Sequence, residues 1–191
     1  LHAQVFDKLD RVVMTSATLT TSKGFDFIKE RIGFQPDEEL SLDAPFDYSR
    51  QALLYVPDDL PEPGDEAGVY VEGIANRCRE LVAVSGGKTF ILFTSYALLN
   101  QVYEKLDEMQ FHFPLIRQGD MPTGLMIKKF KEKPSVIFGT NSFWQGVDVP
   151  GDALQSVIIT KLPFDVPKEP LTEARIEELR RQHIDPFKHY Q

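Results

Sequence analysis

Residues 138–151 combine a threonine, several glycines and an aspartate in an order that could bind a phosphorylated ligand. Thr140 and its small neighbours would leave a hydroxyl and backbone N–H groups free to meet a phosphate. Gly146 would let the chain approach a ligand closely, and Asp148 offers a carboxylate suited to a ribose hydroxyl or a cation. An ordinary loop that ends in a turn at Pro150 would contain the same residue types, so the stretch alone leaves both interpretations open.

Two other clusters of hydroxyl side chains follow apolar runs. Ser16 and Thr18 come after residues 11–15, and Thr94 and Ser95 come after residues 89–93. The hydroxyls of Ser16 and Thr18 fit a strand end that passes into a helix cap. Those of Thr94 and Ser95 are well placed to bind phosphate oxygens. They are equally well placed to cap the helix, so both roles remain open.

Residues 86–89, Gly-Gly-Lys-Thr, look like the end of a P-loop but lack its context. A P-loop needs a preceding strand, a following helix and an earlier glycine at the position that Val82 occupies here. The pattern instead predicts a helix before this stretch and a strand after it. We therefore expect no nucleotide to bind at Lys88.

Cysteine and histidine offer little chemistry. The single cysteine, Cys78, excludes an internal disulfide and a multi-cysteine metal site, and its apolar helical neighbours predict a buried, inert thiol. The four histidines have no spacing typical of a metal site or a catalytic pair: His2, His112, His183 and His189. We predict no catalytic residue and no metal ligand within the chain.

The length of 191 residues and the 42% hydrophobic content fit one domain of ordinary size with a small appendage. No apolar run approaches the ~20 residues that span a bilayer, and no signal-peptide pattern opens the chain. These features predict a soluble, cytoplasmic protein.

The net charge of −8 argues at first against a polyanionic partner. Nine acidic residues, however, gather in two short stretches, and without them 20 acidic residues face 21 basic ones: Asp37, Glu38, Glu39, Asp43, Asp58, Asp59, Glu62, Asp65 and Glu66. A local basic groove is therefore possible. The most basic segment, residues 128–133, could contribute to such a groove or form a solvated helix face.

The elements that must position these residues follow from hydrophobic periodicity. It predicts strands at 11–15, 52–56, 89–93, 113–116, 135–138 and 156–160, and helices at 22–33, 67–84, about 96–106, 125–131 and 171–182. The strands on either side of residues 138–151 are expected to be buried. Alternating strands and helices indicate an α/β fold with a mainly parallel sheet, whose loops of interest lie at the carboxyl ends of the strands.

Several stretches resemble one known family. Residues 140–150, Thr-Asn-Ser-Phe-Trp-Gln-Gly-Val-Asp-Val-Pro, resemble the fifth conserved motif of superfamily 2 helicases, in the form found in the DinG/XPD branch. Residues 15–19 resemble the third motif and residues 92–96 the fourth, while 118–121 resemble a turn of the second lobe. The resemblance spans nearly the whole chain and implies a RecA-like, three-layer α/β/α lobe.

The resemblance also implies roles for individual residues. Contacts to the DNA backbone would come from Thr94, Ser95, Gly119 and Thr140. An ATP cleft between two lobes would be lined by Gln145, Gly146 and Asp148. Coupling of the nucleotide's state to the DNA would involve Ser16 and Thr18.

Parts that such a helicase needs are missing from these residues: a P-loop, an Asp-Glu metal-binding motif and a Gln-x-x-Gly-Arg-x-x-Arg motif. The resemblance therefore implies the second motor lobe of a longer ATP-dependent DNA helicase that uses ATP and Mg²⁺, travels 5′ to 3′ on single-stranded DNA and works with the first lobe of the same polypeptide. This piece alone would be inactive. Residues 1–33 would form the junction with the first lobe, 34–68 an acidic connecting segment, and 69–191 the second lobe, incomplete at its C-terminus.

Two rival functions remain open at this stage. A self-contained hydrolase of small phosphate esters could use Asp148, although no base, nucleophile or metal-ligand set accompanies that carboxylate. A non-catalytic nucleic-acid-binding module would need only the DNA-facing turns.

Overall fold

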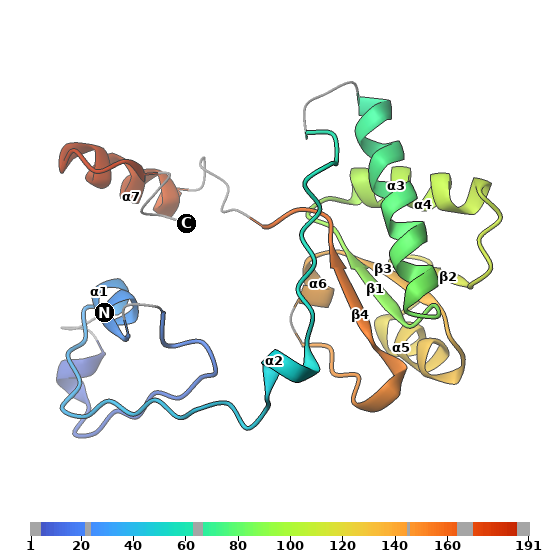
Figure 1. Ribbon diagram of the computed structural model, residues 1–191. Helices are drawn as coiled ribbons and strands as arrows, with labels where there is room; N and C mark the ends of the chain where they lie inside the picture. The colour runs from blue at the N-terminus through green and yellow to red at the C-terminus, as the bar shows by residue number, and fades with distance from the viewer. Residues whose placement is uncertain (1–4, 22–23, 63–66, 145, 164–169, 187–191) are drawn as a thin grey trace. The chain divides into compact units, whose positions relative to one another are not determined.

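The computed structural model describes residues 5–21, 24–62, 67–144, 146–163 and 170–186 (Figure 1). The contacts between residues divide the chain into two compact units, Leu1–Val56 and Pro57–Gln191. None of the helices in the described ranges combines the length and the apolar character needed to cross a lipid bilayer.

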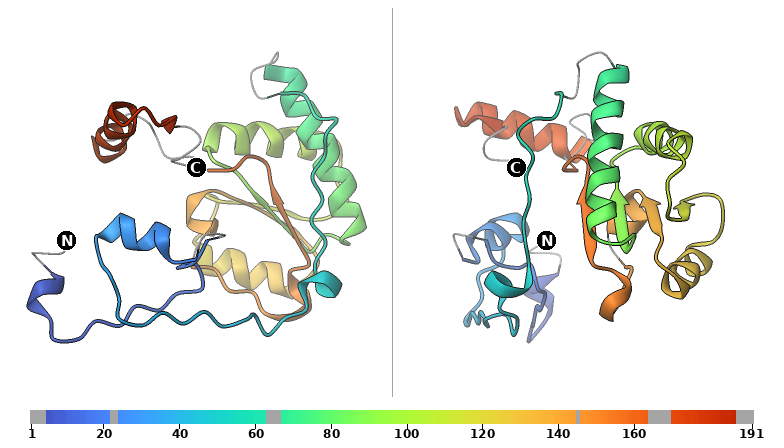
Figure 2. Two further views of the ribbon diagram at one scale, coloured as in Figure 1. Left: turned by 60° about the vertical axis from the view of Figure 1, so that its left-hand side comes forward. Right: turned by 45° about the vertical axis from the view of Figure 1, so that its right-hand side comes forward.

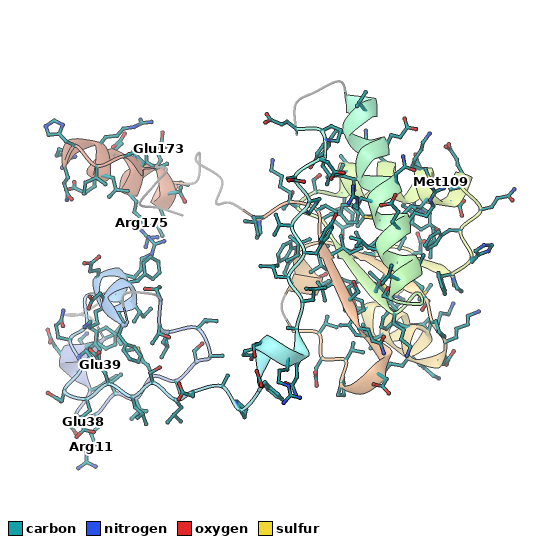
Figure 3. All side chains as sticks on the ribbon, viewed as in Figure 1. Arg11, Glu38, Glu39, Met109, Glu173 and Arg175 are labelled. Carbon is teal, nitrogen blue, oxygen red and sulfur yellow. The ribbon has the colours of Figure 1, made fainter. Side chains whose placement is uncertain are left out.

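The first unit holds short elements: the 3-10 helix η1 (Phe6–Lys8) and the α-helices α1 (Asp26–Ile32) and α2 (Tyr48–Gln51). Helix α1 ends at Gly33 as predicted, because Gly33 adopts a left-handed φ of 66° and donates its N–H to the carbonyl of Lys29. The predicted start at Ser22 lies outside the described residues. Lys29 Nζ lies 3.0 Å from Glu39 Oε1, and Figure 3 labels Glu39 within this unit.

Two strand predictions in this unit are wrong. Residues 11–15 and 52–56 form no strand, and most of their apolar side chains are exposed to solvent, with Val13 90% and Leu53 93% exposed. A strand is stable only when a neighbour pairs its N–H and C=O groups. Among the described residues, no strand lies beside either segment, so neither segment has a partner for a backbone ladder.

The second unit contains a sheet whose four strands in the described residues are all parallel, in the order β2-β3-β1-β4. This confirms the predicted α/β fold. Its elements in chain order are α3 (Ala67–Val84), β1 (Thr89–Leu92), α4 (Tyr96–Glu108), β2 (Leu115–Arg117), α5 (Thr123–Glu132), β3 (Val136–Gly139), α6 (Asn141–Trp144), η2 (Gly151–Ala153), β4 (Ser156–Ile159) and α7 (Pro170–Arg181).

Helices cover both faces of the sheet, and alternate residues of each strand point to opposite faces. Ile91 and Phe138 pack on one face with α3 and α4, while Phe90 and Ile137 pack on the other with α5. The left view of Figure 2 shows α4 and α5 on opposite sides of the sheet. Each face therefore has its own apolar cluster, and the central strands β1 and β3 are buried throughout.

Strand β4 is less buried than predicted. It pairs with β1, and its residues alternate between partly buried and exposed, with Val157 52% and Ile159 47% exposed. No strand pairs with its other side in the described residues. The sequence prediction erred because a short apolar run does not distinguish a central strand from an edge strand.

The stretch that looked like a P-loop is a helix-to-strand turn, as predicted. Helix α3 ends at Val84 and strand β1 starts at Thr89, with Gly86 and Gly87 at φ 62° and 88° between them. The ring of Phe113 occupies the space that a side chain at Gly87 would need. These glycines therefore end a helix and admit an aromatic ring.

Candidate functional site

The turns that follow the strands meet at one edge of the sheet, because all its described strands run in the same direction. Strand β1 leads to Thr94 and Ser95, β2 to Gln118 and Gly119, and β3 to Thr140. Since the order is β2-β3-β1, these three turns are neighbours, spaced by about 4.8 Å per strand. The structure thus brings together the four residues predicted to face a nucleic-acid backbone.

Gln118 joins two of these turns. Its side-chain Oε1 accepts the N–H of Thr140 at 2.6 Å and the hydroxyl of Thr140 at 3.1 Å. The side-chain Nε2 of Gln118 donates to Ser142 Oγ at 2.8 Å, and its backbone N–H donates to the carbonyl of Phe138 at 3.0 Å. One side chain therefore fixes the turn after β2 against the turn after β3.

Thr140 is less available than the sequence suggested. It is 5% exposed, and both its N–H and its hydroxyl are directed to Gln118. Ser142, two residues on, is exposed. The hydroxyl nearest to solvent after β3 therefore belongs to Ser142.

In the turn after β1, the hydroxyl of Ser95 caps α4 by accepting the N–H of Leu98 at 3.3 Å. The capping interpretation is therefore correct for Ser95, which is exposed and keeps its own proton for another acceptor. Thr94 is half-buried, and none of the described residues bonds its side chain.

Arg117 stabilises the turn after β2 through contacts with two side chains. The guanidinium of Arg117 donates to Asp120 Oδ1 at 3.0 Å and stacks over the ring of Tyr103, 4.7 Å from its centroid. The hydrogen bond to Asp120 raises the pKa of Arg117, and desolvation raises that of Tyr103. Gly119 lies between the paired residues, exposed, at a φ of 104° that favours glycine.

The connection from β3 to β4 packs on the apolar cluster at the α5 face of the sheet. The ring of Phe143 packs on Gly139, where a Cβ would come within 2.6 Å of its Cγ. Trp144 Nε1 donates to the carbonyl of Phe93 at 3.3 Å, which ties the connection to the end of β1. Val147 and Val149 pack against the same cluster.

Between these anchors, Gly146 and Asp148 are exposed, and Gly146 has a φ of 77° with open space around it. The two residues predicted to face a nucleotide thus lie on one supported segment. Gln145, assigned with them, lies outside the described residues.

Ser16 and Thr18 lie in the first unit and are exposed. Ser16 Oγ accepts the N–H of Thr18 at 3.2 Å, so it closes a local turn. A cavity of about 730 Å³ lies beside them within this unit, lined in part by Ser16, Phe25 and Leu40.

The lysines of α5 lie at the wrong edge of the sheet for the turns described above. Helix α5 starts six residues after β2 ends, and its last residue, Glu132, is followed closely by β3 at Val136. Its second half, with Lys128, Lys129 and Lys131, therefore points to the edge where the strands begin. This placement favours a solvated helix face for the most basic segment.

The described residues offer no metal cluster, and their one thiol is deeply buried. In the ranges that the structure describes, no three His, Cys, Asp or Glu side chains come together as a metal site would require. Burial raises the pKa of Cys78 to about 12, as expected for a thiol inside the α3–sheet core.

Sequence reasoning overlooked the roles of Gln118, Ser142 and Trp144. Gln118 stood within a recognised turn, and the other two within the stretch that opened the sequence analysis. Hydrophobic periodicity could not reveal these contacts, because Gln118 and Ser142 are polar and lie 24 residues apart in the chain.

The profile of the helicase C-terminal domain family matches residues 78–191. The chain is 38% identical over 186 residues to the ATP-dependent DNA helicase YoaA of Haemophilus influenzae, an alignment that covers 97% of this chain and 29% of that protein. It is 36% identical over 179 residues to the ATP-dependent helicase DinG of Mycobacterium tuberculosis, covering 92% and 26%. The 3′-5′ exonuclease DinG of Bacillus subtilis is 32% identical over 195 residues, covering 98% and 21%. The chain thus spans less than a third of the length of these relatives.

Proposed function

Because the chain belongs to the helicase C-terminal domain family, related to the DinG and YoaA helicases, we propose that it is the second motor lobe of an ATP-dependent DNA helicase. In this role it supplies contacts to the DNA backbone and one wall of the ATP cleft. Residues 69–191 form the lobe, and 1–33 belong to its junction with the first lobe.

The observation that carries this proposal is the row of three neighbouring turns at the carboxyl edge of the sheet. The turns after β1, β2 and β3 offer hydroxyls and glycine backbone, which are the groups that bind phosphates without reading bases. The residues assigned to this track are Thr94, Ser95, Gly119 and Thr140.

The nucleotide is assigned to the segment after Trp144. Asp148 is exposed two residues after Gly146, so its carboxylate suits a ribose hydroxyl or a cation facing another lobe. Magnesium commonly takes one or two carboxylates together with the phosphates. Asp148 alone fits at most a supporting part, and the remaining ligands belong to the first lobe.

The first unit includes the residues assigned to the junction with the first lobe. Residues 11–15, which lead into the stretch that resembles the third motif, have an apolar pattern and form no strand in the described structure. Ser16 and Thr18, which follow these residues, are assigned to coupling the nucleotide's state to the DNA.

In the intact polypeptide, ATP draws the two lobes together, and repeated closure and release moves single-stranded DNA, 5′ to 3′ by family resemblance. Hydrolysis needs the phosphate-binding loop of the other lobe. The 191-residue chain alone therefore has no ATPase activity.

The test compares two neighbouring carboxylates in the full-length polypeptide. DNA-stimulated ATP hydrolysis should fall at least about tenfold in Asp148→Asn, which corresponds to about 1.4 kcal/mol of transition-state stabilisation. Asp152 is an exposed aspartate of the same connection. The ATPase rate of Asp152→Asn should stay within about twofold of the wild-type rate. Unwinding of duplexes with a 5′ or a 3′ tail gives the direction of travel.

Equal ATPase rates in wild type and Asp148→Asn would remove the nucleotide assignment. If the 191-residue chain alone hydrolysed a small phosphate ester and lost that activity in Asp148→Asn, the self-contained hydrolase would be the correct function instead.

A further inference from the structure

The hydrogen bonds around Gln118 fix the orientation of its side-chain amide. A backbone N–H can only donate, so the amide atom 2.6 Å from the nitrogen of Thr140 has to be the carbonyl oxygen. The amide nitrogen therefore faces Ser142, 2.8 Å from its Oγ.

This orientation decides where two hydroxyl protons point. Oε1 of Gln118 can only accept, so the hydroxyl of Thr140 donates its proton to Gln118. Thr140 itself is only 5% exposed. Nε2 of Gln118 only donates, so Ser142 Oγ is the acceptor and its own proton has to point elsewhere. Ser142 is exposed and has no other hydrogen-bond partner in the described part of the chain.

We infer that Ser142, oriented by Gln118, is the hydroxyl that donates to a phosphate of the DNA backbone, and that Thr140 is a positioning residue. The inference rests on the proposed function and assigns this contact of the track to a residue two positions beyond the one that family resemblance indicates. Gln118 thus acts through Ser142.

The arrangement has a further consequence for charge at position 118. A glutamate there would still accept both protons of Thr140, but its second oxygen would face Ser142 and attract the serine proton inward. Gln118→Glu therefore keeps the turns joined while it reverses the hydrogen bond that frees Ser142. The pair Gln118 and Ser142 should be energetically coupled in DNA binding.

The experiment measures binding of a fluorescent oligothymidylate, across a salt series, to the full-length polypeptide and to the 191-residue chain. Ser142→Ala should weaken binding at least about tenfold, the effect of one hydrogen bond to a charged phosphate, with an unchanged salt slope because serine displaces no counterion. Thr140→Val should weaken binding less than Ser142→Ala. In the Gln118→Glu background, Ser142→Ala should have no further effect, and thermal melts should confirm that each variant is folded.

Each other outcome is decisive. The inference is overturned, while the proposed function stands, if Ser142→Ala binds DNA as tightly as wild type. The same holds if Thr140→Val binds DNA more weakly than Ser142→Ala. Additive losses in Gln118→Glu and Ser142→Ala would show that Gln118 does not direct the serine. If neither wild-type form binds DNA, the proposed function fails and the inference fails with it.

Discussion

Oε1 of Gln118 lies 2.6 Å from the backbone nitrogen of Thr140, across the boundary between two strand-ending turns. The N–H of Thr140 follows β3 directly, inside a residue that is almost fully buried, where water does not replace a lost acceptor. The edge of the sheet is therefore held together by a side chain in addition to the backbone ladder.

Replacing Gln118 by leucine should destabilise the fold, because it leaves the buried N–H of Thr140 without an acceptor. The expected loss is about 1–3 kcal/mol in the free energy of unfolding, measured by urea denaturation. Gln101→Leu is the matched control, since Gln101 is an exposed residue of α4. Equal stability of the two variants would mean that the Gln118 contact contributes nothing measurable.

Gly139→Ala should be costly because the ring of Phe143 packs where the new methyl group would stand, 2.6 Å from Cγ. Overpacking of this kind costs about 1–3 kcal/mol. Gly124→Ala provides the control in α5, where a methyl group meets nothing within 4 Å and should stabilise the helix by up to about 1 kcal/mol. Urea midpoints that move in the same direction for both variants would contradict the packing described here.

The buried thiol of Cys78 predicts a loss of stability in alkali. Its folded pKa is about 12, against an ordinary value of 9.0, so above pH 9 the unfolded chain releases the proton while the folded chain retains it. Stability from this group is complete below pH 9 and falls by about 1.4 kcal/mol per pH unit between 9 and 12. The difference in unfolding free energy between wild type and Cys78→Ala should shrink with rising pH over this window. A difference independent of pH would argue against burial of the thiol.

The single tryptophan of the chain, Trp144, should report ligand binding by its fluorescence. It is half-buried, hydrogen-bonded to Phe93, and precedes the segment assigned to the nucleotide. We expect an emission change when single-stranded DNA is added to the 191-residue chain, and none in Trp144→Phe. A titration that gives the same affinity by tryptophan emission and by oligonucleotide anisotropy would tie the signal to binding, and unchanged emission at saturation would place the DNA away from this connection.

How much the sequence predicted depends on where the partner of each residue lies. Residues 89–93 and 135–138 are largely apolar runs whose pairing partners belong to the same unit, and the strands that hydrophobic periodicity predicts there are confirmed. Residues 52–56 carry an equally clear pattern but have no pairing partner in the described residues, so the prediction of a strand failed. The pairing of Gln118 with Thr140 joins residues 22 positions apart through an amide, and hydrophobic periodicity contains no information about such contacts.

The distribution of lysines gives a last prediction, because two candidate DNA-binding surfaces lie at opposite edges of the sheet. Lys161 is exposed and follows the end of β4, beside Thr160, whose hydroxyl donates to Leu92. The lysines of α5 lie toward the other edge.

If DNA follows the turns, Lys161→Gln should lower the slope of log affinity against log salt by about 0.7, the value for one phosphate contact on a single strand. The double variant Lys128→Gln and Lys129→Gln removes twice the charge and should leave the slope nearly unchanged. The opposite result would assign the DNA to α5 and require a different track, since an electrostatic contact to phosphate is detected by the salt slope wherever it is made.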